Sequence, residues 1–407
     1  MPAPAARRSV GRPGRLVVVL GALTAFGPLT MDLYLPGLPD LAEDLGTGVA
    51  DVQVTVTACV LGLAFGQVLA GPIGDTFGRR RPLLIGLALF TLASVGCALA
   101  SSIGMLNALR VVQGLAGATG ITLARAMVRD SFEGAEVARM YSSLAAVVSV
   151  APIVAPLVGA LLLAVGNWRF LFLFLAVVGA VLLIVSAAWT AETLPRARRR
   201  SGHPADILRT YRDLLRDRGY LSYTVPLAMS AVLMFGFLTA SSFVYQDVYG
   251  VSPQVYGLLF GVNGCVLMAS NIVNKRLVGR VPQRRLLEVG LVWIAGGGSV
   301  LAIAGIAGAG AMVVIPLVSV ACCGLGMVNP NATALALTEQ KERAGSAAGL
   351  MGLLQFAAGA IVPPVLGAIG TSPATMGGVM ATGGVLALAS FAVLSIRREG
   401  APASAAS

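Results

Sequence analysis

The chain has 407 residues, of which 57% are hydrophobic and only 12% are charged, and its formal charge is +11. A water-soluble domain usually carries about 25% charged residues, so this composition excludes a soluble globular protein. The basic excess does not indicate nucleic-acid binding, because the Lys and Arg residues lie in short segments between long apolar runs.

Apolar runs of about 20 residues recur along the whole chain, and each is long enough to cross roughly 30 Å of hydrocarbon. The breaks between them predict twelve transmembrane helices, at 16–38, 52–72, 82–101, 104–126, 141–165, 168–190, 220–246, 254–276, 283–306, 311–335, 345–368 and 374–395. The first run exceeds the roughly 7–15 apolar residues of a signal peptide, so we expect a retained helix. The fold class predicted is an all-α membrane protein.

The basic residues alternate with the apolar runs in a way that predicts the topology. If the N-terminus is cytoplasmic, all but Arg110 and Arg169 of the 29 Lys and Arg residues fall in or beside cytoplasmic segments. The first outer loop carries acids and no base: Asp40, Glu43, Asp44 and Asp51. Cytoplasmic loops are enriched in Lys and Arg. We therefore expect both termini to be cytoplasmic.

The longest basic loop divides the chain into two halves of six helices. We expect a cytoplasmic tail at 1–15, the first half at 16–190, a cytoplasmic central loop at 191–219, the second half at 220–396 and a cytoplasmic tail at 397–407. The halves share weak repeats: "APLVGA" at 155–160 matches "PPVLGA" at 363–368, and "GLAGATG" from Gly114 matches "GLGMVNP" from Gly324. Parallel repeats are typical of transporters whose substrate site lies near the membrane midplane.

The first apolar run contains a charge that its surroundings do not explain. Asp32 lies in "GPLTMDLYLPGLP" at 27–39, and no other charge occurs between Arg15 and Asp40. A carboxylate in an apolar medium is costly without a partner. An ionisable residue inside a membrane span is a candidate functional site.

The loop between the second and third runs carries the clearest motif, "GPIGDTFGRRRP" at 71–82. It resembles the signature loop of the major facilitator superfamily, G-x-x-x-D-x-x-G-R-[KR], with Thr76 where a basic residue is usual. The matching positions are Gly71, Gly74, Asp75, Gly78, Arg79 and Arg80. Glycines permit close helix approach and a tight turn, and a carboxylate near a helix end can bind arginines. We interpret the loop as a gate; a basic turn that only sets topology is the alternative.

Two further stretches resemble the same family. "LNALRVVQGLAGATG" at 106–120 is similar to its fourth-helix motif and carries Arg110 and Gln113 inside the membrane. "APIVAPLVGA" at 151–160 is similar to the fifth-helix motif of its antiporter branches, with Pro152, Pro156 and Gly159. The match is partial, because Ala155 replaces the usual glycine. Proline and small residues bend a helix and permit tight packing, and ordinary packing is the alternative reading.

Asp32 and Arg110 are expected to lie at similar depth, each about six residues or roughly 9 Å inside its span. We therefore predict that they pair, and that the proton affinity of Asp32 changes when this pairing changes. Such a group can couple transport to protons. A static ion pair, or an aspartate that reaches water from the helix end, remains the alternative.

The sequence around Asp32 narrows the resemblance. "MDLYLPGLPDLAEDL" at 31–45 resembles the first helix of the bicyclomycin/chloramphenicol resistance (Bcr/CflA) branch of drug/proton antiporters, and "AGSAAGLMGLLQFAAGAIVPPVLG" at 344–367 resembles the same branch. The resemblance implies the major facilitator fold and proton-coupled drug efflux by alternating access. Polar and aromatic residues inside the spans are candidates for binding the substrate. They are Tyr34, Gln113, Phe235, Tyr245, Asn263, Asn329, Asn331 and Gln355.

The function expected is a multidrug transporter that exports small apolar or amphipathic compounds in exchange for protons. One alternative is an exporter of an endogenous metabolite, and another is a non-transporting receptor or scaffold. An enzyme is disfavoured because no nucleophile–base set occurs in a span, and an ATP-driven pump because no P-loop occurs. We expect no cofactor, metal or disulfide. The expected partners are substrates, protons and membrane lipids, and the expected state is a monomer in a bacterial-type plasma membrane.

Overall fold

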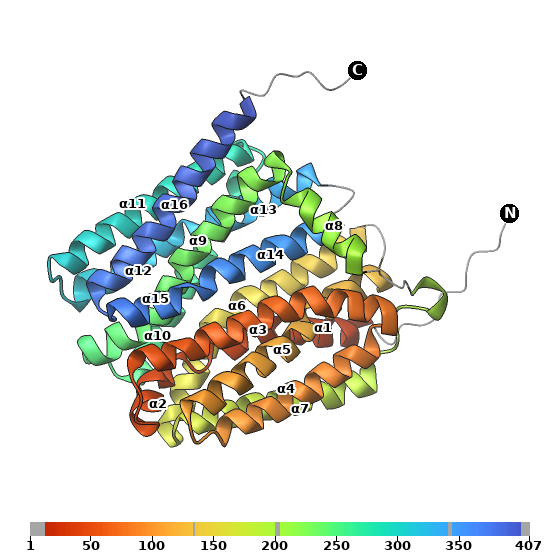
Figure 1. The fold of residues 1–407 in the computed structure, drawn as a ribbon, viewed down its shortest axis with the longest axis horizontal. Coiled ribbons are helices and arrows are strands. Elements are labelled where there is room, and N and C mark those ends of the chain that lie inside the picture. Colours follow the sequence, from red (N-terminus) through yellow and green to blue (C-terminus); the bar gives the residue numbers. More distant parts are fainter. Residues whose placement is uncertain (1–12, 133–134, 200–203, 341–343, 400–407) are drawn as a thin grey trace.

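The structure is a computed structural model that describes residues 13–132, 135–199, 204–340 and 344–399 (Figure 1). The first part of the chain forms α1 (Pro13–Asp32), η1 (Leu35–Gly37), α2 (Leu38–Asp44), α3 (Val49–Phe77), α4 (Arg80–Ala98), α5 (Ile103–Ser131), α6 (Ala135–Val165) and α7 (Trp168–Trp189). The short η2 (Arg196–Arg198) and α8 (Pro204–Leu214) follow. The second part forms α9 (Arg218–Phe243), the π-helix η3 (Val244–Val248), α10 (Pro253–Leu277), α11 (Gln283–Ile306), α12 (Ala311–Cys323), α13 (Leu325–Glu339), α14 (Ala344–Ala360), α15 (Val362–Ile369) and α16 (Pro373–Glu399).

The helices agree with the expected all-α membrane fold. Among the described residues, 11 segments are long and apolar enough to cross a membrane, and α6 contributes a shorter apolar stretch at Val150–Val165. Several helices extend beyond the expected ends, since α3 continues to Phe77 and α5 to Ser131. Apolar runs stop at the first polar residue, whereas backbone hydrogen bonding continues into the polar boundary of the membrane.

Three expected spans are interrupted. The first span breaks after Asp32, the tenth at Gly324 and the eleventh at Ile361. A proline follows two of these breaks closely, at Pro36 and Pro363, and proline removes one backbone donor from a helix. Broken helices inside membranes expose carbonyl groups that other parts of the protein must satisfy.

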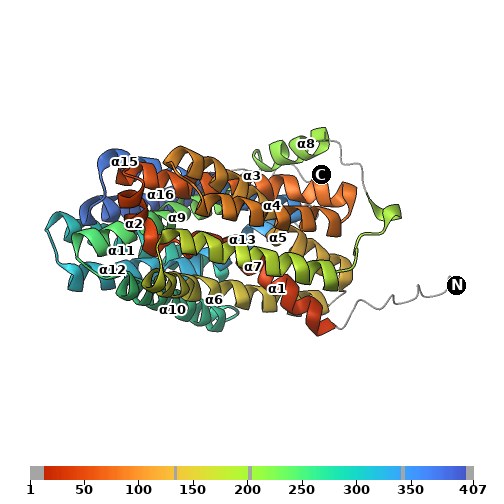
Figure 2. The same ribbon diagram turned by 90° about the horizontal axis from the view of Figure 1, so that it is seen from below.

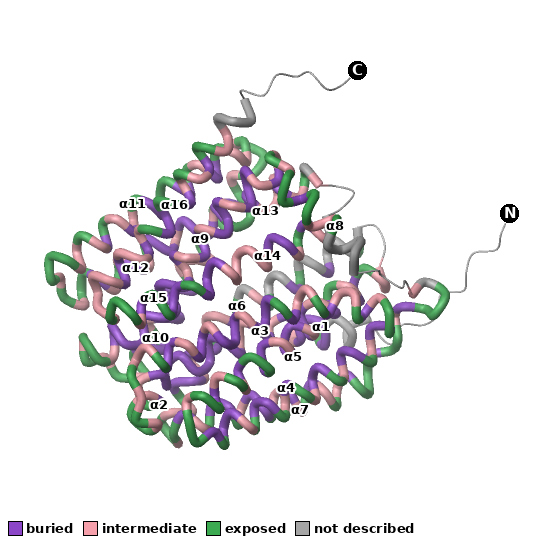
Figure 3. The backbone as a smooth tube through the Cα atoms, in the orientation of Figure 1, coloured by how far each residue is buried: buried purple, intermediate pink, exposed green. Residues whose placement is uncertain are grey.

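The helices form two bundles that meet along a shared interface (Figures 1 and 2). In the first bundle α3 packs along α5, α4 along α7, and α1 against α5 and α6. In the second bundle α9 and α11 both pack on α16. The bundles touch where α6 meets α10 and where α3 meets α14 and α15. Figure 3 shows buried residues on the inner faces of both bundles.

The two ends of the bundles differ in charge. The end that holds Arg79, Arg80 and Arg199 is called the arginine-rich end below, and the end that holds Asp40, Asp44 and Asp51 is called the acidic end. Glycines let helices cross closely between these ends. A Cβ atom on Gly62 would lie 2.2 Å from the Val111 carbonyl oxygen, so α3 and α5 pack backbone to backbone.

Candidate functional site

Asp32 is the last residue of α1, where the first span stops being helical. Leu33 and Tyr34 form a turn, and Pro36 has no N–H to donate to the Asp32 carbonyl. The side chain of Asp32 is only 6% exposed. Helix α6 covers the break, because a Cβ on Gly159 would lie 2.0 Å from the Leu33 carbonyl oxygen. The chain thus places a buried carboxylate beside a break in α1.

Arg110, on α5, is buried in the first bundle and is held by neutral groups. Its Nη1 donates to Gln113 Oε1 at 2.6 Å and to the Thr30 carbonyl at 3.3 Å. Its Nε donates to the Thr55 carbonyl at 3.5 Å. Its guanidinium carbon lies 4.2 Å from the centre of the Tyr34 ring, in cation–π geometry. The Thr30 carbonyl is available because the last four carbonyls of a helix lack intrahelical donors.

The expected ion pair between Asp32 and Arg110 does not form. Within the described part of the chain, neither residue belongs to any ion pair. The carbonyls, Gln113 and the aromatic ring hold part of the Arg110 guanidinium, whereas its buried Nη2 has no hydrogen-bond partner within the described residues. The prediction that the two residues pair is therefore wrong for this conformation, and Asp32 has no neutralising cation among these residues.

The helix break also joins the two bundles at the acidic end. Ser242 Oγ, on α9, donates to the Leu35 carbonyl at 2.6 Å, and Gln246 Nε2, on η3, donates to the Pro36 carbonyl at 3.1 Å. Side chains can reach these carbonyls because the first span is not a continuous helix there, although the Leu35 carbonyl also accepts the Leu38 N–H. The π-helix η3 places Gln246 opposite the break, and such insertions occur often at functional sites.

Further contacts close the same end. Gln53 Nε2 donates to Thr371 Oγ1 at 2.8 Å, and Thr57 Oγ1 donates to the Ala360 carbonyl at 3.2 Å. These four hydrogen bonds between the bundles all lie toward the acidic end. This conformation is therefore held closed at the acidic end.

The fifth-helix motif lies at the interface between the bundles. Pro152 and Pro156 both lie inside α6, where each removes a backbone donor. On one side Gly159 contacts the break of α1, and on the other a Cβ on Gly257 of α10 would lie 2.9 Å from the Pro156 carbonyl. The motif thus contacts both bundles next to Asp32.

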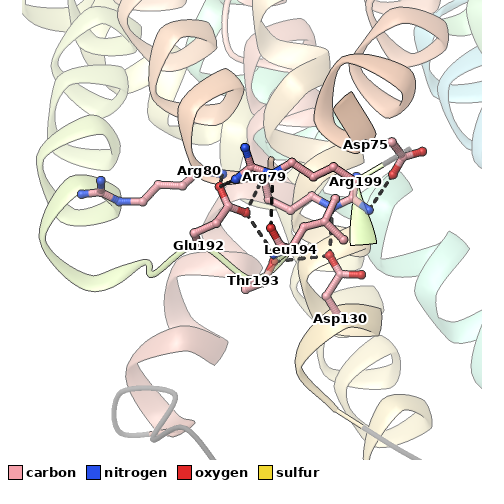
Figure 4. Close-up of polar contacts among 8 residues, drawn as sticks. All are labelled: Asp75, Arg79, Arg80, Asp130, Glu192, Thr193, Leu194 and Arg199. Atoms are coloured by element: carbon pink, nitrogen blue, oxygen red, sulfur yellow. Dashed lines mark hydrogen bonds and ion pairs between the residues drawn. The ribbon is translucent and has the colours of Figure 1, made fainter. Parts of the chain in front are cut away.

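The loop at 71–82 forms a charge cluster at the arginine-rich end (Figure 4). Arg79 is only 2% exposed and forms ion pairs with Asp75 at 2.7 Å and Asp130 at 2.8 Å. Glu192 accepts hydrogen bonds from the backbone N–H groups of Arg79 at 2.8 Å and Arg80 at 3.3 Å. The cluster therefore ties the α3–α4 loop to the ends of α5 and α7.

The glycines of this loop have specific roles in its shape. Gly78 has a φ of +91°, which favours glycine, and a Cβ there would lie 2.3 Å from Glu192 Oε2. A Cβ on Gly74 would lie 2.5 Å from a side-chain carbon of Leu123, whereas Gly71 has open space. Asp130 and Glu192 were not among the predicted loop residues; their only signal in the sequence is that each is an acid close to arginines, Asp130 beside Arg129 and Glu192 before Arg196.

A pocket of about 130 Å³ lies in the second bundle. Three predicted substrate residues, Phe235, Asn329 and Gln355, line it together. Sequence reasoning missed the other lining residues, which are Ser230, Ala231, Met234, Leu325 and Phe356. The Phe235 and Phe356 rings lie 6.4 Å apart, edge to face. The described lining residues include no charged side chain, so the pocket offers aromatic faces and two carboxamides.

The remaining substrate candidates lie elsewhere. Tyr34 and Gln113 are buried in the first bundle around Arg110. In the second bundle, Tyr245 packs against Tyr256 with ring centres 5.9 Å apart. Asn331 donates to Asn274 Oδ1 at 2.7 Å, which joins α13 to α10.

Asn263 is also buried, with 5% of its surface exposed. None of the five candidates Tyr34, Gln113, Tyr245, Asn263 and Asn331 lines the pocket. No group of three or more His, Cys, Asp or Glu side chains in the described residues has the arrangement of a metal site.

Comparisons with known proteins agree with this architecture. The family model "Major Facilitator Superfamily" matches residues 20–363. The chain is 37% identical over 388 residues to "Uncharacterized MFS-type transporter YdgK" of Bacillus subtilis, covering 95% of this chain and 96% of that protein. It is 30% identical over 346 residues to "Bicyclomycin resistance protein homolog" of Haemophilus influenzae, covering 85% and 87%. Among solved structures, a D-xylose–proton symporter superposes with a TM-score of 0.75 at 16% identity, covering 93% of this chain and 96% of that one.

Proposed function

We propose that this chain, which belongs to the major facilitator superfamily of membrane transporters, exports small apolar or amphipathic compounds in exchange for protons. Members of this family are transporters rather than enzymes, and the chain is a multi-pass membrane protein. The resistance-protein name of the relative from Haemophilus influenzae supports drugs as the substrate class. The motifs of this chain at 31–45 and 344–367 support assignment to the Bcr/CflA branch.

The observation that carries the proposal is the environment of Asp32. It is buried at a helix break, contacts no cation in the described residues, and lies beside the interface of the two bundles. A buried carboxylate without a cation is costly when ionised and inexpensive when protonated. Its protonation can therefore change the packing of the α1 break against α6 and the second bundle.

Alternating access links this acid to the pocket. We place the arginine-rich end and both termini in the cytoplasm, following the topology rule. The present conformation, closed at the acidic end, then faces the cytoplasm. Drug enters the pocket around Phe235, Asn329 and Gln355. Opening of the acidic end releases the drug outside and admits a proton to Asp32, and the cytoplasm receives that proton after the return step.

In this proposal the proton gradient supplies the driving force, and no cofactor takes part. One chain suffices, because the first bundle contributes Asp32 and the second bundle contributes the pocket. Drug efflux from vesicles against an imposed pH gradient tests it. Wild type should move drug with the gradient, and Asp32→Asn should lose gradient-driven transport while still binding drug. Asp40→Asn, an exposed acid at the same end, is the matched control. Full coupling in Asp32→Asn would contradict the assignment.

A further inference from the structure

Helix α8 (Pro204–Leu214) packs on α14 of the second bundle at the arginine-rich end. A Cβ on Gly349 would lie 3.4 Å from the Tyr211 hydroxyl, and α14, which contains Gly349, begins at Ala344. At 1.5 Å per residue, Tyr211 therefore contacts α14 about 8 Å from the start of that helix, near the expected membrane boundary. Figure 2 shows α8 at the edge of the bundle, outside the other helices.

The inner side of α8 and the turn after it are fixed to the second bundle. Leu214 is only 1% exposed. Asp217, in the turn after α8, caps α9 by accepting the Tyr220 N–H at 3.0 Å, and its own N–H donates to the Asp213 carbonyl at 3.1 Å. The Tyr220 hydroxyl donates to the Ala347 carbonyl of α14 at 2.7 Å. Helix α8 is thus attached to α9 and α14 without a flexible joint.

The outer side of α8 and of the turn after it carries three arginines. Arg209, Arg212 and Arg216 are exposed, and their spacing of three and four residues puts them on one helical face. None of them forms an ion pair within the described residues. The neighbouring Leu215 is 48% exposed. A basic face with an exposed apolar residue at this depth is typical of a helix that lies on a membrane surface.

We propose that α8 binds anionic phospholipid headgroups through Arg209, Arg212 and Arg216. Charge complementarity selects this partner, because the three guanidinium groups lie together near the membrane boundary and outnumber Asp213, the carboxylate that the same helical spacing places beside Arg209 and Arg216. Each arginine near an anionic surface strengthens binding roughly fivefold. Since α8 is fixed to α9 and α14, headgroup binding anchors the second bundle to the membrane surface.

Amide hydrogen exchange of the full chain in lipid nanodiscs tests the proposal. The discs contain either phosphatidylcholine alone or phosphatidylcholine with phosphatidylglycerol. The amides of 205–216 should exchange several-fold more slowly with the anionic lipid, and high salt should reduce this protection. Arg209→Gln/Arg212→Gln/Arg216→Gln should remove the difference. Unchanged exchange rates of the α9 amides would verify that the variant is folded.

The control variant removes the same charge elsewhere at that end. Arg276, Arg280 and Arg285 are also exposed, and replacing all three with glutamine should leave the protection of α8 intact. Equal exchange in both lipids would overturn the proposal, as would loss of protection in the control variant. Equal protection of α8 by soluble polyglutamate in phosphatidylcholine discs would show a site for acidic polymers and would also overturn it.

Discussion

Replacing Ser242 and Gln246 with alanine should open the acidic end of the protein. These side chains donate to the Leu35 and Pro36 carbonyls at 2.6 Å and 3.1 Å, and they join the second bundle to the break of α1. They also contact each other, since Gln246 Nε2 donates to Ser242 Oγ at 2.8 Å.

The size of the effect follows from the bonds that are lost. A hydrogen bond of this kind contributes about 1 kcal/mol net. The double variant should therefore shift the equilibrium between the closed and open acidic end by about 2 kcal/mol, or roughly 30-fold. Each single variant should give at least half of this shift, because it removes its own bond to the first bundle and also the contact between Gln246 and Ser242 that positions the remaining side chain.

Spin labels on exposed sites of the two bundles at the acidic end, such as Glu43 and Ala307, report this opening. The background would carry serine in place of Cys265 and Cys323, the two cysteines that are not buried. Electron–electron distance measurements should show a longer-distance population in the double variant. Ser299→Ala is the matched control, since Ser299 bonds only within its own helix, to Ala295 at 2.7 Å. An unchanged distance distribution in the double variant would refute the reasoning.

Other substitutions test the pocket, the charge cluster and the helix break. Gly359→Ala should weaken drug binding about tenfold, because the added Cβ would lie 2.2 Å from a Phe235 ring carbon and push the ring into the pocket. Equilibrium binding measures this affinity, and an unchanged affinity would exclude the pocket as the drug site. Arg79→Gln should lower the free energy of unfolding by about 3 kcal/mol, since it leaves the partly buried carboxylates of Asp75 and Asp130 unpaired. Thermal unfolding should show a clear loss of stability. Equal stability of Arg79→Gln and of Arg81→Gln, which changes an exposed arginine, would contradict this. Gly159→Ala should reduce transport severely, because its Cβ would lie 2.0 Å from the carbonyl oxygen at the break of α1; wild-type flux would show that α6 does not need this close approach.

The fold was largely predictable because its main signal is composition. Each apolar run corresponds to a helical segment, and the basic loops separate the runs. The breaks in three spans were not predicted, although Pro36 and Pro363 were visible, because a proline indicates lost backbone bonds without indicating which groups satisfy the freed carbonyls. At the first break, Ser242 and Gln246 of the other bundle donate to such carbonyls.

The candidate site was predictable only in part. Asp32 and Arg110 stood out as charges inside apolar runs. Their similar expected depth did not determine whether the two side chains meet, because depth does not fix the rotation of each helix. Arg110 is held by carbonyl oxygens, Gln113 and the Tyr34 ring, and none of these neutral groups leaves a charge pattern in a sequence. The pocket residues come from α9, α13 and α14, so their convergence depends on helix rotation, which polar character alone does not determine.

The central claim is that Asp32 carries the proton that the transporter exchanges for drug. The most direct test measures proton movement that is driven by a drug gradient alone. Vesicles without a pH gradient would be loaded with drug and a pH-sensitive dye, and drug would then flow out down its own gradient. Wild type and Asp40→Asn should carry protons inward as drug leaves, so the interior becomes acidic. Asp32→Asn should release or exchange drug without a change in internal pH. Acidification by Asp32→Asn at the wild-type ratio of protons to drug would contradict the account.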